Sequence, residues 1–237
     1  HAGVPTDVRA IGGPVVAGRG RGGRVRPLRG GASIGHPEGI PGTLGLAYGG
    51  YLLTSGHVAA RLNRAEPGDA LLQPAPADGG RLPADRVGTL ARFVPLDLDP
   101  PVPRASHRNV VDAALARQEE RAAASEVRSI GRLRGWRPEG CLDVGSPVQK
   151  TGRSTGHTRG RVTALHVTID VAFGWQTARF ERQILTTRMS AAGDSGAIAA
   201  TEDGLAVGLV CAGSEHATVV NPIEPLGELL GVPLPAP

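Results

Sequence analysis

The segment Ala191-Ala-Gly-Asp-Ser-Gly-Ala-Ile-Ala-Ala200 joins a serine framed by glycines to an apolar run that is typical of a short buried strand. Gly193 and Gly196 allow the backbone to turn tightly around Ser195. The same succession of turn residues and short apolar runs recurs over residues 32–118 and again over 140–221. This spacing predicts a chain of many short strands joined by turns.

The composition of the chain supports that prediction. The 237 residues include Gly 35 and Pro 20, but only Phe 3, Trp 2 and Tyr 2. So many helix breakers argue against a helical bundle. The Gly and Pro content does not force disorder, because 40% of the residues are hydrophobic. The length suffices for a substantial core in one domain or two small ones.

Two β-rich halves predict an all-β fold of two six-stranded antiparallel β-barrels packed face to face, with a short C-terminal helix. The N-terminal barrel takes residues 32–118, and the C-terminal barrel with its terminal helix takes residues 140–237. An arm rich in Arg, Gly and Pro (residues 1–31) precedes them, and a linker (119–139) separates them. Strong helix formers over residues 117–127 predict that the linker starts as an exposed helix.

Turn residues and apolar runs also mark the individual strands. Gly49-Gly50 separates Thr43–Ala47 from Tyr51–Thr54, which predicts a hairpin. In the second half the predicted strands are Val144–Gln149, Arg161–Val171, Gln183–Thr187, Ala197–Ala200 and Leu205–Cys211, followed by the helix Pro222–Leu230.

Charge and apolar patterning give no support for a nucleic acid or a membrane as partner. The formal charge is +4, and Lys150 is the only lysine among many arginines. The arginines of the arm lie among glycines, as in RGG-type nucleic-acid segments, but no aromatics interleave them. We therefore expect a solvated arm or an extended first strand. No apolar run approaches the ~18–20 residues that span a bilayer.

Cysteine and histidine usage limits the compartment and the cofactors. Cys141 and Cys211 are the only cysteines, so one disulfide at most can form. With no visible signal peptide, this usage favours the cytoplasm over secretion. The chain begins at His1 rather than Met, so a processed form and export stay open. No HExxH-like spacing occurs, and we expect neither a metal site nor another cofactor.

Three sites in the sequence carry side chains suited to acyl transfer. His57 follows an apolar strand, Asp112 lies inside the apolar run Val110–Ala116, and Ser195 lies between glycines. A serine hydroxyl becomes a useful nucleophile when a neutral histidine removes its proton. A buried carboxylate on the far ring nitrogen fixes the tautomer of that histidine. The amides of Gly193 and Ser195 can face a developing oxyanion.

Each of these sites alone also has a plainer explanation. A histidine near a strand end is often structural, an acid in an apolar run is often a paired core carboxylate, and a four-residue Gly-Asp-Ser-Gly match recurs by chance. The order His57, Asp112, Ser195, with the first two in one half of the chain, favours the joint interpretation.

Four blocks of the chain resemble the chymotrypsin-fold serine peptidases, nearest the bacterial streptogrisin and α-lytic branch and the bacterial trypsin-like peptidases with few disulfides. The blocks are LTSGHVAA (53–60), VVDAALAR (110–117), VQKTGRSTGHTRGRVTAL (148–165) and AAGDSGAIAA (191–200). The resemblance covers roughly residues 32–230. It implies a double β-barrel with the active site between the barrels, and no cofactor.

The resemblance also implies roles for individual residues. On it, His57 is the general base, Asp112 orients that base and Ser195 is the nucleophile, while the amides of Gly193 and Ser195 form the oxyanion hole. Streptogrisin-like enzymes pair the acid of the Gly-Asp-Ser-Gly motif with an internal arginine. At the matching position stands Lys150, so we expect a partly buried Lys150–Asp194 pair; the alternatives are Arg153 as the partner and a merely exposed Lys150.

The chain departs from the family at its substrate-binding positions. Ala197 replaces the usual glycine after the serine motif, a change that we expect to be tolerated. The usual Ser-Trp-Gly edge reads Cys211-Ala212-Gly213, in which Gly213 can still offer backbone pairing to an extended peptide.

Specificity is expected to depend on the base of the first pocket. Met189 stands six residues before Ser195, where it cannot pair with a basic side chain and favours an apolar or small residue before the cut. Alternatively, the Met189 side chain packs in the barrel core. Glu215 and His216 follow on the next loop, and Glu215 is the one route to basic specificity.

The leading hypothesis is a serine endopeptidase that acts through a Ser-His-Asp triad and an acyl-enzyme on protein or peptide substrates. The alternative is a latent or inactive protease-fold binding module that requires an activating or regulatory protein. A non-peptide acyl hydrolase would instead need a G-x-S-x-G elbow, which the sequence around Ser195 lacks.

Overall fold

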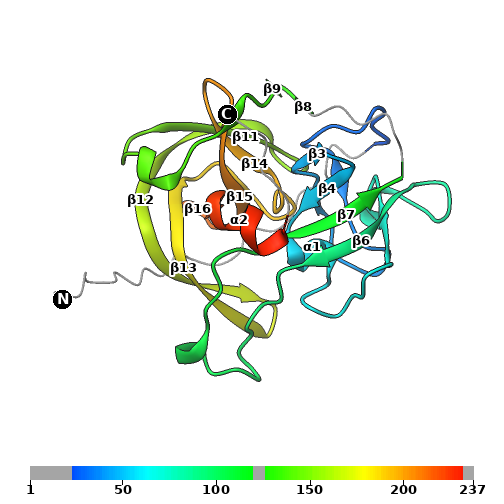
Figure 1. Cartoon of the computed structure of the whole chain (residues 1–237), viewed down its shortest axis with the longest axis horizontal. Coiled ribbons are helices and arrows are strands. Elements are labelled where there is room, and N and C mark those ends of the chain that lie inside the picture. The colour runs from blue at the N-terminus through cyan, green and yellow to red at the C-terminus, as the bar shows by residue number, and fades with distance from the viewer. Residues whose placement is uncertain (1–22, 120–125, 232–237) are drawn as a thin grey trace.

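Strand follows strand in the computed structural model, which describes residues 23–119 and 126–231 and contains only short helices (Figure 1). The elements of the first half are β1 (Ser33–Ile34), β2 (Gly42–Thr43), β3 (Leu46–Tyr48), β4 (Tyr51–Thr54), α1 (Gly56–Ala59), β5 (Ala70–Leu72), η1 (Pro76–Asp78), β6 (Arg86–Phe93), η2 (Arg104–Ser106) and β7 (Ala114–Gln118).

The strands of the first half are linked all the way around a common core. The main sheet has the order β3-β4-β7-β6-β5, and β1 pairs with β2. A bridge between Gly35 and Leu72 connects the end of β1 to β5. The enclosed core consists of small and branched apolar side chains, among them the fully buried Leu28, Ile34 and Leu52. Leu28 belongs to the predicted arm, whose residues 1–22 lie outside the described residues.

The predicted hairpin around Gly49-Gly50 is confirmed. Tyr48 of β3 pairs with Tyr51 of β4, so two residues form the turn. Both glycines have positive φ, 58° and 82°, as a two-residue type I′ turn requires. The turn brings β4 antiparallel to β3 and directs its far end toward α1.

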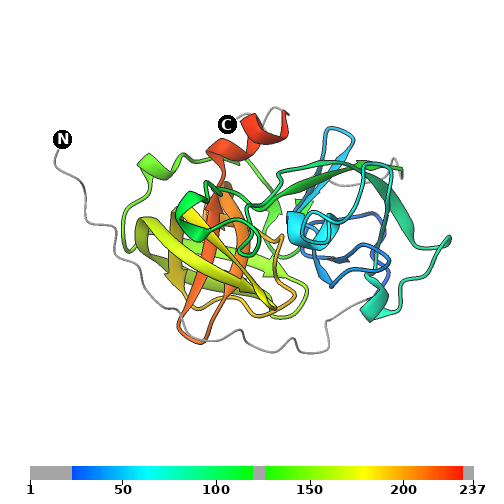
Figure 2. The same ribbon diagram turned by 90° about the horizontal axis from the view of Figure 1, so that it is seen from below.

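The second half contains longer strands. Its elements are β8 (Glu126–Val127), β9 (Gly131–Arg132), β10 (Gly135–Trp136), η3 (Glu139–Cys141), β11 (Pro147–Gly152), β12 (Gly156–Phe173), β13 (Gln176–Thr187), β14 (Ile198–Thr201), β15 (Leu205–Gly213), β16 (Ala217–Pro222) and α2 (Glu224–Leu230). The sheet order is β10-β15-β14-β11-β12-β13-β16, and β15 also pairs with β16. That last pairing closes the sheet on itself, and Figure 2 shows this half beside the first.

The C-terminal helix forms as predicted, whereas the helix predicted over 117–127 is wrong where the structure describes it. β7 continues to Gln118, and β8 begins at Glu126; residues 120–125 lie outside the described part. Arg117 pairs with both Tyr51 and Thr89. These cross-strand hydrogen bonds outweigh the helix propensity of the segment, which is a weak preference. No helix among residues 23–119 and 126–231 is long and apolar enough to cross a bilayer.

A buried ion pair joins the two halves. Arg153, in the turn between β11 and β12, binds Asp78 of η1 through two nitrogens, with Nη2 2.7 Å from Oδ1. Ser33 Oγ also donates to this carboxylate. Burial alone raises the pKa of Asp78, but the hydrogen bonds from Arg153 and Ser33 and the charge of Arg153 bring that pKa below its usual value. Asp78 is thus ionised in the folded protein.

We predict that Asp78→Asn lowers the free energy of unfolding by about 3 kcal/mol, because it leaves the Arg153 guanidinium buried without its counter-charge. Urea unfolding at pH 7 measures the loss. Asp203→Asn is the matched control, since Asp203 forms an exposed pair with Arg137 and such a pair contributes about 0–1 kcal/mol.

The difference between wild type and Asp78→Asn depends on pH. The pKa of Asp78 is lower folded than unfolded, so its contribution is complete above the unfolded pKa of about 4. It is lost as the pH falls through the folded pKa. An equal difference at pH 7 and pH 2.5 would contradict a charge-based role for Asp78.

Candidate active site

His57 and Asp112 meet at the edge of the first half. The single turn α1 follows β4 directly and carries His57, and Asp112 lies two residues before β7, which pairs with β4. His57 Nδ1 is hydrogen-bonded to Asp112 Oδ2, and the backbone N–H of His57 donates to Oδ1 at 2.8 Å. This pair of contacts fixes both the backbone and the ring. A proton on Nδ1 leaves Nε2 as an acceptor.

The surroundings of Asp112 hold its backbone in place. The backbone N–H of Asp112 donates to Asn221 Oδ1 at 2.9 Å, and Asn221 Nδ2 in turn donates to Gln183 Oε1 at 2.7 Å. A Cβ on Gly56 would approach Asp112 Oδ1 to 2.9 Å, so the closeness of the two segments depends on a glycine. Sequence analysis missed Asn221 and Gln183, which lie on distant strands.

Ser195 lies in the turn between β13 and β14, where its neighbours Gly193 and Gly196 have φ of +95° and +93°. A Cβ at Gly193 would meet Ser154 Oγ at 2.4 Å, and one at Gly196 would meet the carbonyl of Thr43 at 2.3 Å. Both positions therefore require glycine.

In this turn the serine hydroxyl has a hydrogen-bond partner in the protein, whereas two backbone amides have none among the described residues. The Ser195 hydroxyl donates to the carbonyl of Cys211 at 3.0 Å. Within residues 23–119 and 126–231, no hydrogen bond joins it to His57, and the amides of Gly193 and Ser195 donate to no protein group. These two donors, one on each side of Asp194, are thus free to bind an added oxygen atom.

Thr43 of β2 attaches the serine turn to the first half. Its backbone N–H donates to the carbonyl of Ser195 at 2.8 Å, and its hydroxyl donates to the carbonyl of Gly193 at 2.8 Å. The same hydroxyl accepts the backbone N–H of Arg153 at 2.9 Å. Nothing in the local sequence marks Thr43, because its partners are more than one hundred residues away.

Lys150 and Asp194 form a fully buried ion pair. Lys150 Nζ lies 3.1 Å from Asp194 Oδ2, and both side chains have 0% exposure. Lys150 also donates to Thr155 Oγ1 and to the carbonyl of Gly156. Burial lowers the pKa of Lys150, and the charge and hydrogen bond of Asp194 oppose that shift. Arg153, the alternative partner, binds Asp78 instead.

Asp194 is satisfied on both oxygens besides this pair. Its Oδ1 accepts the backbone N–H of Ser154 at 2.7 Å and that of Thr155 at 3.2 Å. Its Oδ2 accepts the Thr155 hydroxyl at 2.6 Å and the backbone N–H of Ala191 at 3.1 Å. The carboxylate therefore holds the turn before Ser195 against the turn that follows β11.

The predicted substrate-binding segment Cys211–Gly213 lies at the end of β15. Cys211 is buried with its thiol 3.8 Å from Asp112 Oδ2, and its pKa is raised well above the usual value by burial and then by Asp112. The pairing of β14 with β15 ends at Leu209, and β15 continues through Ala212 to Gly213. The backbone of Val210 still bonds to Gly196 and Ala197. At Ala212 and Gly213, within the described residues, β15 pairs only with β16, so this part of its edge is open for an extended peptide.

Met189 has 3% exposure and packs in the core cluster of the second half. Of the two positions that the sequence left open for Met189, the base of the first pocket and the barrel core, the structure has the core. Beside it, Ser190 Oγ lies 2.7 Å from Thr218 Oγ1, and a Cβ on Gly213 would meet Ser190 Oγ at 2.4 Å. Glu215 and His216 are on the β15–β16 loop, where Glu215 is exposed and has no ion pair among the described residues.

A further feature concerns His57. Phe173, at the end of β12, lies with its ring centroid 5.1 Å from that of His57, a contact with no signal in the sequence.

Both cysteines are free thiols, Cys141 exposed and Cys211 buried. Among residues 23–119 and 126–231 no cluster of three or more His, Cys, Asp or Glu side chains could hold a metal ion.

Comparison with known proteins identifies the fold. No protein-family model and no curated protein matches this chain. The solved structure of Cellulomonas bogoriensis chymotrypsin matches with a TM-score of 0.61 and 22% identity, covering 89% of this chain and 99% of that one. A Nocardiopsis protease matches with TM-score 0.61 and 20% identity, covering 87% and 98%. Protease A of Thermobifida fusca has the same TM-score with 19% identity, covering 89% and 99%. The chain therefore has the chymotrypsin fold that its sequence predicted.

Proposed function

We propose that this protein is a serine endopeptidase that cleaves peptide bonds through Ser195, His57 and Asp112. The observation that carries the proposal is that Cys211 contacts both an oriented His57–Asp112 pair and a glycine-framed serine whose neighbouring amides are free. The fold supports it, since these three residues come from both halves and occupy the region where the halves meet. No cofactor enters the chemistry.

The reaction follows from these positions. The Ser195 hydroxyl attacks the carbonyl carbon of the scissile bond, and its proton passes to His57 Nε2. Asp112 stabilises the imidazolium through Nδ1. The amides of Gly193 and Ser195 donate to the oxygen that becomes negative. The C–N bond then breaks as His57 returns the proton to the leaving amine, and water later hydrolyses the acyl-enzyme by the same proton transfers.

The Lys150–Asp194 pair is proposed to set the shape of the oxyanion hole. Asp194 lies between the two residues that supply the amide donors, and its own side chain is held by the pair and by four further hydrogen bonds. Because the carboxylate is inaccessible to water, its position depends on Lys150 neutralising it. Lys150 is a positioning residue that acts through Asp194.

We propose an apolar or small residue before the cut. The position where the sequence predicted the base of the pocket holds no acid: Met189 is uncharged and packs in the core, and its neighbours Ser190 and Thr218 bond to each other. The open edge of β15 at Ala212–Gly213 supports binding of the substrate as an added strand. Small side chains at this edge leave the backbone accessible.

One observation favours a second candidate, a latent protease that requires an activating protein. The Ser195 hydroxyl is engaged by the carbonyl of Cys211 rather than by His57. In an active enzyme this hydroxyl must rotate about its Cα–Cβ bond to reach Nε2. Catalytic hydrogen bonds often tighten only when substrate binds, so we rank the active enzyme first.

We predict that a fluorophosphonate probe labels the wild-type protein and not Ser195→Ala, because only a serine deprotonated by its base reacts with such a probe. His57→Ala should also abolish labelling while leaving Ser195 present. In-gel fluorescence and intact mass measure the adduct. A folded wild type without label would contradict an active enzyme and favour the latent form.

We also predict that Lys150→Met slows labelling and peptide cleavage by about 100-fold, the scale of losing one oxyanion-hole donor. Stability should fall by about 3 kcal/mol, because Asp194 then lacks its buried counter-charge. Arg159→Met is the matched control, since Arg159 is an exposed cation on neighbouring β12. Full activity in folded Lys150→Met would disprove the positioning role.

A further inference from the structure

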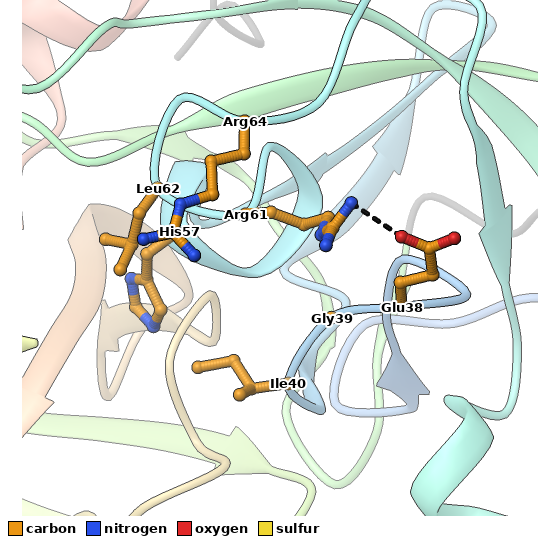
Figure 3. A pocket seen from close by; sticks show the side chains of 7 residues that line it. All are labelled: Glu38, Gly39, Ile40, His57, Arg61, Leu62 and Arg64. Atoms are coloured by element: carbon orange, nitrogen blue, oxygen red, sulfur yellow. Dashed lines mark ion pairs between the residues drawn. The ribbon is translucent and has the colours of Figure 1, made fainter. Parts of the chain in front are cut away.

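A separate pocket opens beside His57 on the side of the first half. Its volume is about 250 Å³, below the ~300–1,000 Å³ typical of sites that enclose a whole small molecule, so its size suits one side chain. The residues that line it are Glu38, Gly39, Ile40, His57, Arg61, Leu62 and Arg64 (Figure 3).

One wall of the pocket is a left-handed turn. Arg61, Leu62 and Asn63 have φ of 51°, 56° and 66°, a run of three residues other than glycine in a conformation that costs about 1–2 kcal/mol each. Asn63 holds the turn by donating to the carbonyl of Leu96 at 2.8 Å and accepting its N–H at 2.9 Å. Backbone strain of this kind clusters at binding sites, which supports a function for the wall.

The pocket carries one cation without a counter-charge. Arg61 lies 2.8 Å from Glu38, and the two charges offset each other. Arg64 is exposed and has no ion pair or side-chain hydrogen bond within residues 23–119 and 126–231. Figure 3 shows Arg61 directed toward Glu38 and Arg64 directed toward the His57 side of the pocket. Ile40, which is 56% exposed, adds an apolar wall.

The pocket is placed to contact the part of a substrate that leaves with the amine. In the proposed reaction the acyl part stays on Ser195 and pairs with β15, both in the second half. The leaving amine receives its proton from His57. Every residue of the pocket belongs to segments 38–40 and 57–64 of the first half, so the pocket lies on the side of His57 where the leaving amine emerges.

We propose that this pocket binds the side chain of the residue that follows the scissile bond, and that Arg64 makes it prefer an acidic side chain. The inference rests on the proposed function. A carboxylate placed here can bind the Arg64 guanidinium through two oxygens, a geometry that guanidinium groups favour. Arg64 lies after the strained turn and has no positive φ, so replacing it leaves the turn intact.

The test uses internally quenched peptides that are identical up to the cut and carry Asp, Asn or Lys immediately after it. The readout is the ratio of kcat/KM for the Asp and Lys peptides, measured within each variant. We expect wild type to favour Asp by about fivefold, the scale of one exposed charge pair. Arg64→Gln should remove the preference and Arg64→Glu should reverse it. Arg81→Gln, an exposed arginine outside the pocket, should keep the wild-type ratio.

Fluorophosphonate labelling separates the two proposals, because the probe has no residue beyond the reacting bond. Wild type that labels and cleaves the series with equal rates, or variants that keep the wild-type ratio, would overturn the pocket assignment and leave the peptidase intact. Wild type that does not label, or labels but cleaves no peptide, would overturn the peptidase proposal and the pocket assignment with it.

Discussion

The buried charge on Asp194 is the constraint on which the serine turn depends. A carboxylate with no exposure to water is stable only when opposite charge and donors surround it. Lys150 supplies the charge, and the donors come from the turn after β11 and from Ala191. Because Asp194 is flanked by Gly193 and Ser195, every contact that satisfies it also limits where the two free amides can point.

The first half is tied to that turn by a second set of polar contacts. Thr43 binds the carbonyls of Gly193 and Ser195, and the N–H groups of the same two peptide units, those of Asp194 and Gly196, donate to other carbonyls. The backbone on both sides of Asp194 is thus fixed, while the N–H groups of Gly193 and Ser195 stay free. The Arg153–Asp78 pair fixes the neighbouring turn to η1 of the first half. The site is therefore not a property of either half, since His57 comes from one and Ser195 from the other.

The sequence predicted those parts of the site that have a local signal. His57 follows a strand, Asp112 interrupts an apolar run and Ser195 lies between glycines, so neighbouring residues reveal each. Thr43 and Asn221 have no such signal, because their importance arises from partners 150 and 109 residues away. The helix predicted over 117–127 failed for a related reason: the pairing of β7 with β4 and β6, invisible locally, outweighed helix propensity.

Two surfaces next to His57 differ in chemistry, which bears on the proposed specificity. Phe173 packs with the His57 ring and belongs to the same apolar cluster as Ala212. The Phe173 ring provides an apolar surface next to His57 that the small side chain of Ala212 does not provide. The pocket lined from Glu38 to Arg64 combines apolar side chains with one uncompensated positive charge. In the proposed peptidase, an apolar surface and a basic pocket that share one histidine would select opposite side-chain chemistry on the two sides of the cleaved bond, and together they would restrict the peptides that bind more than either surface alone.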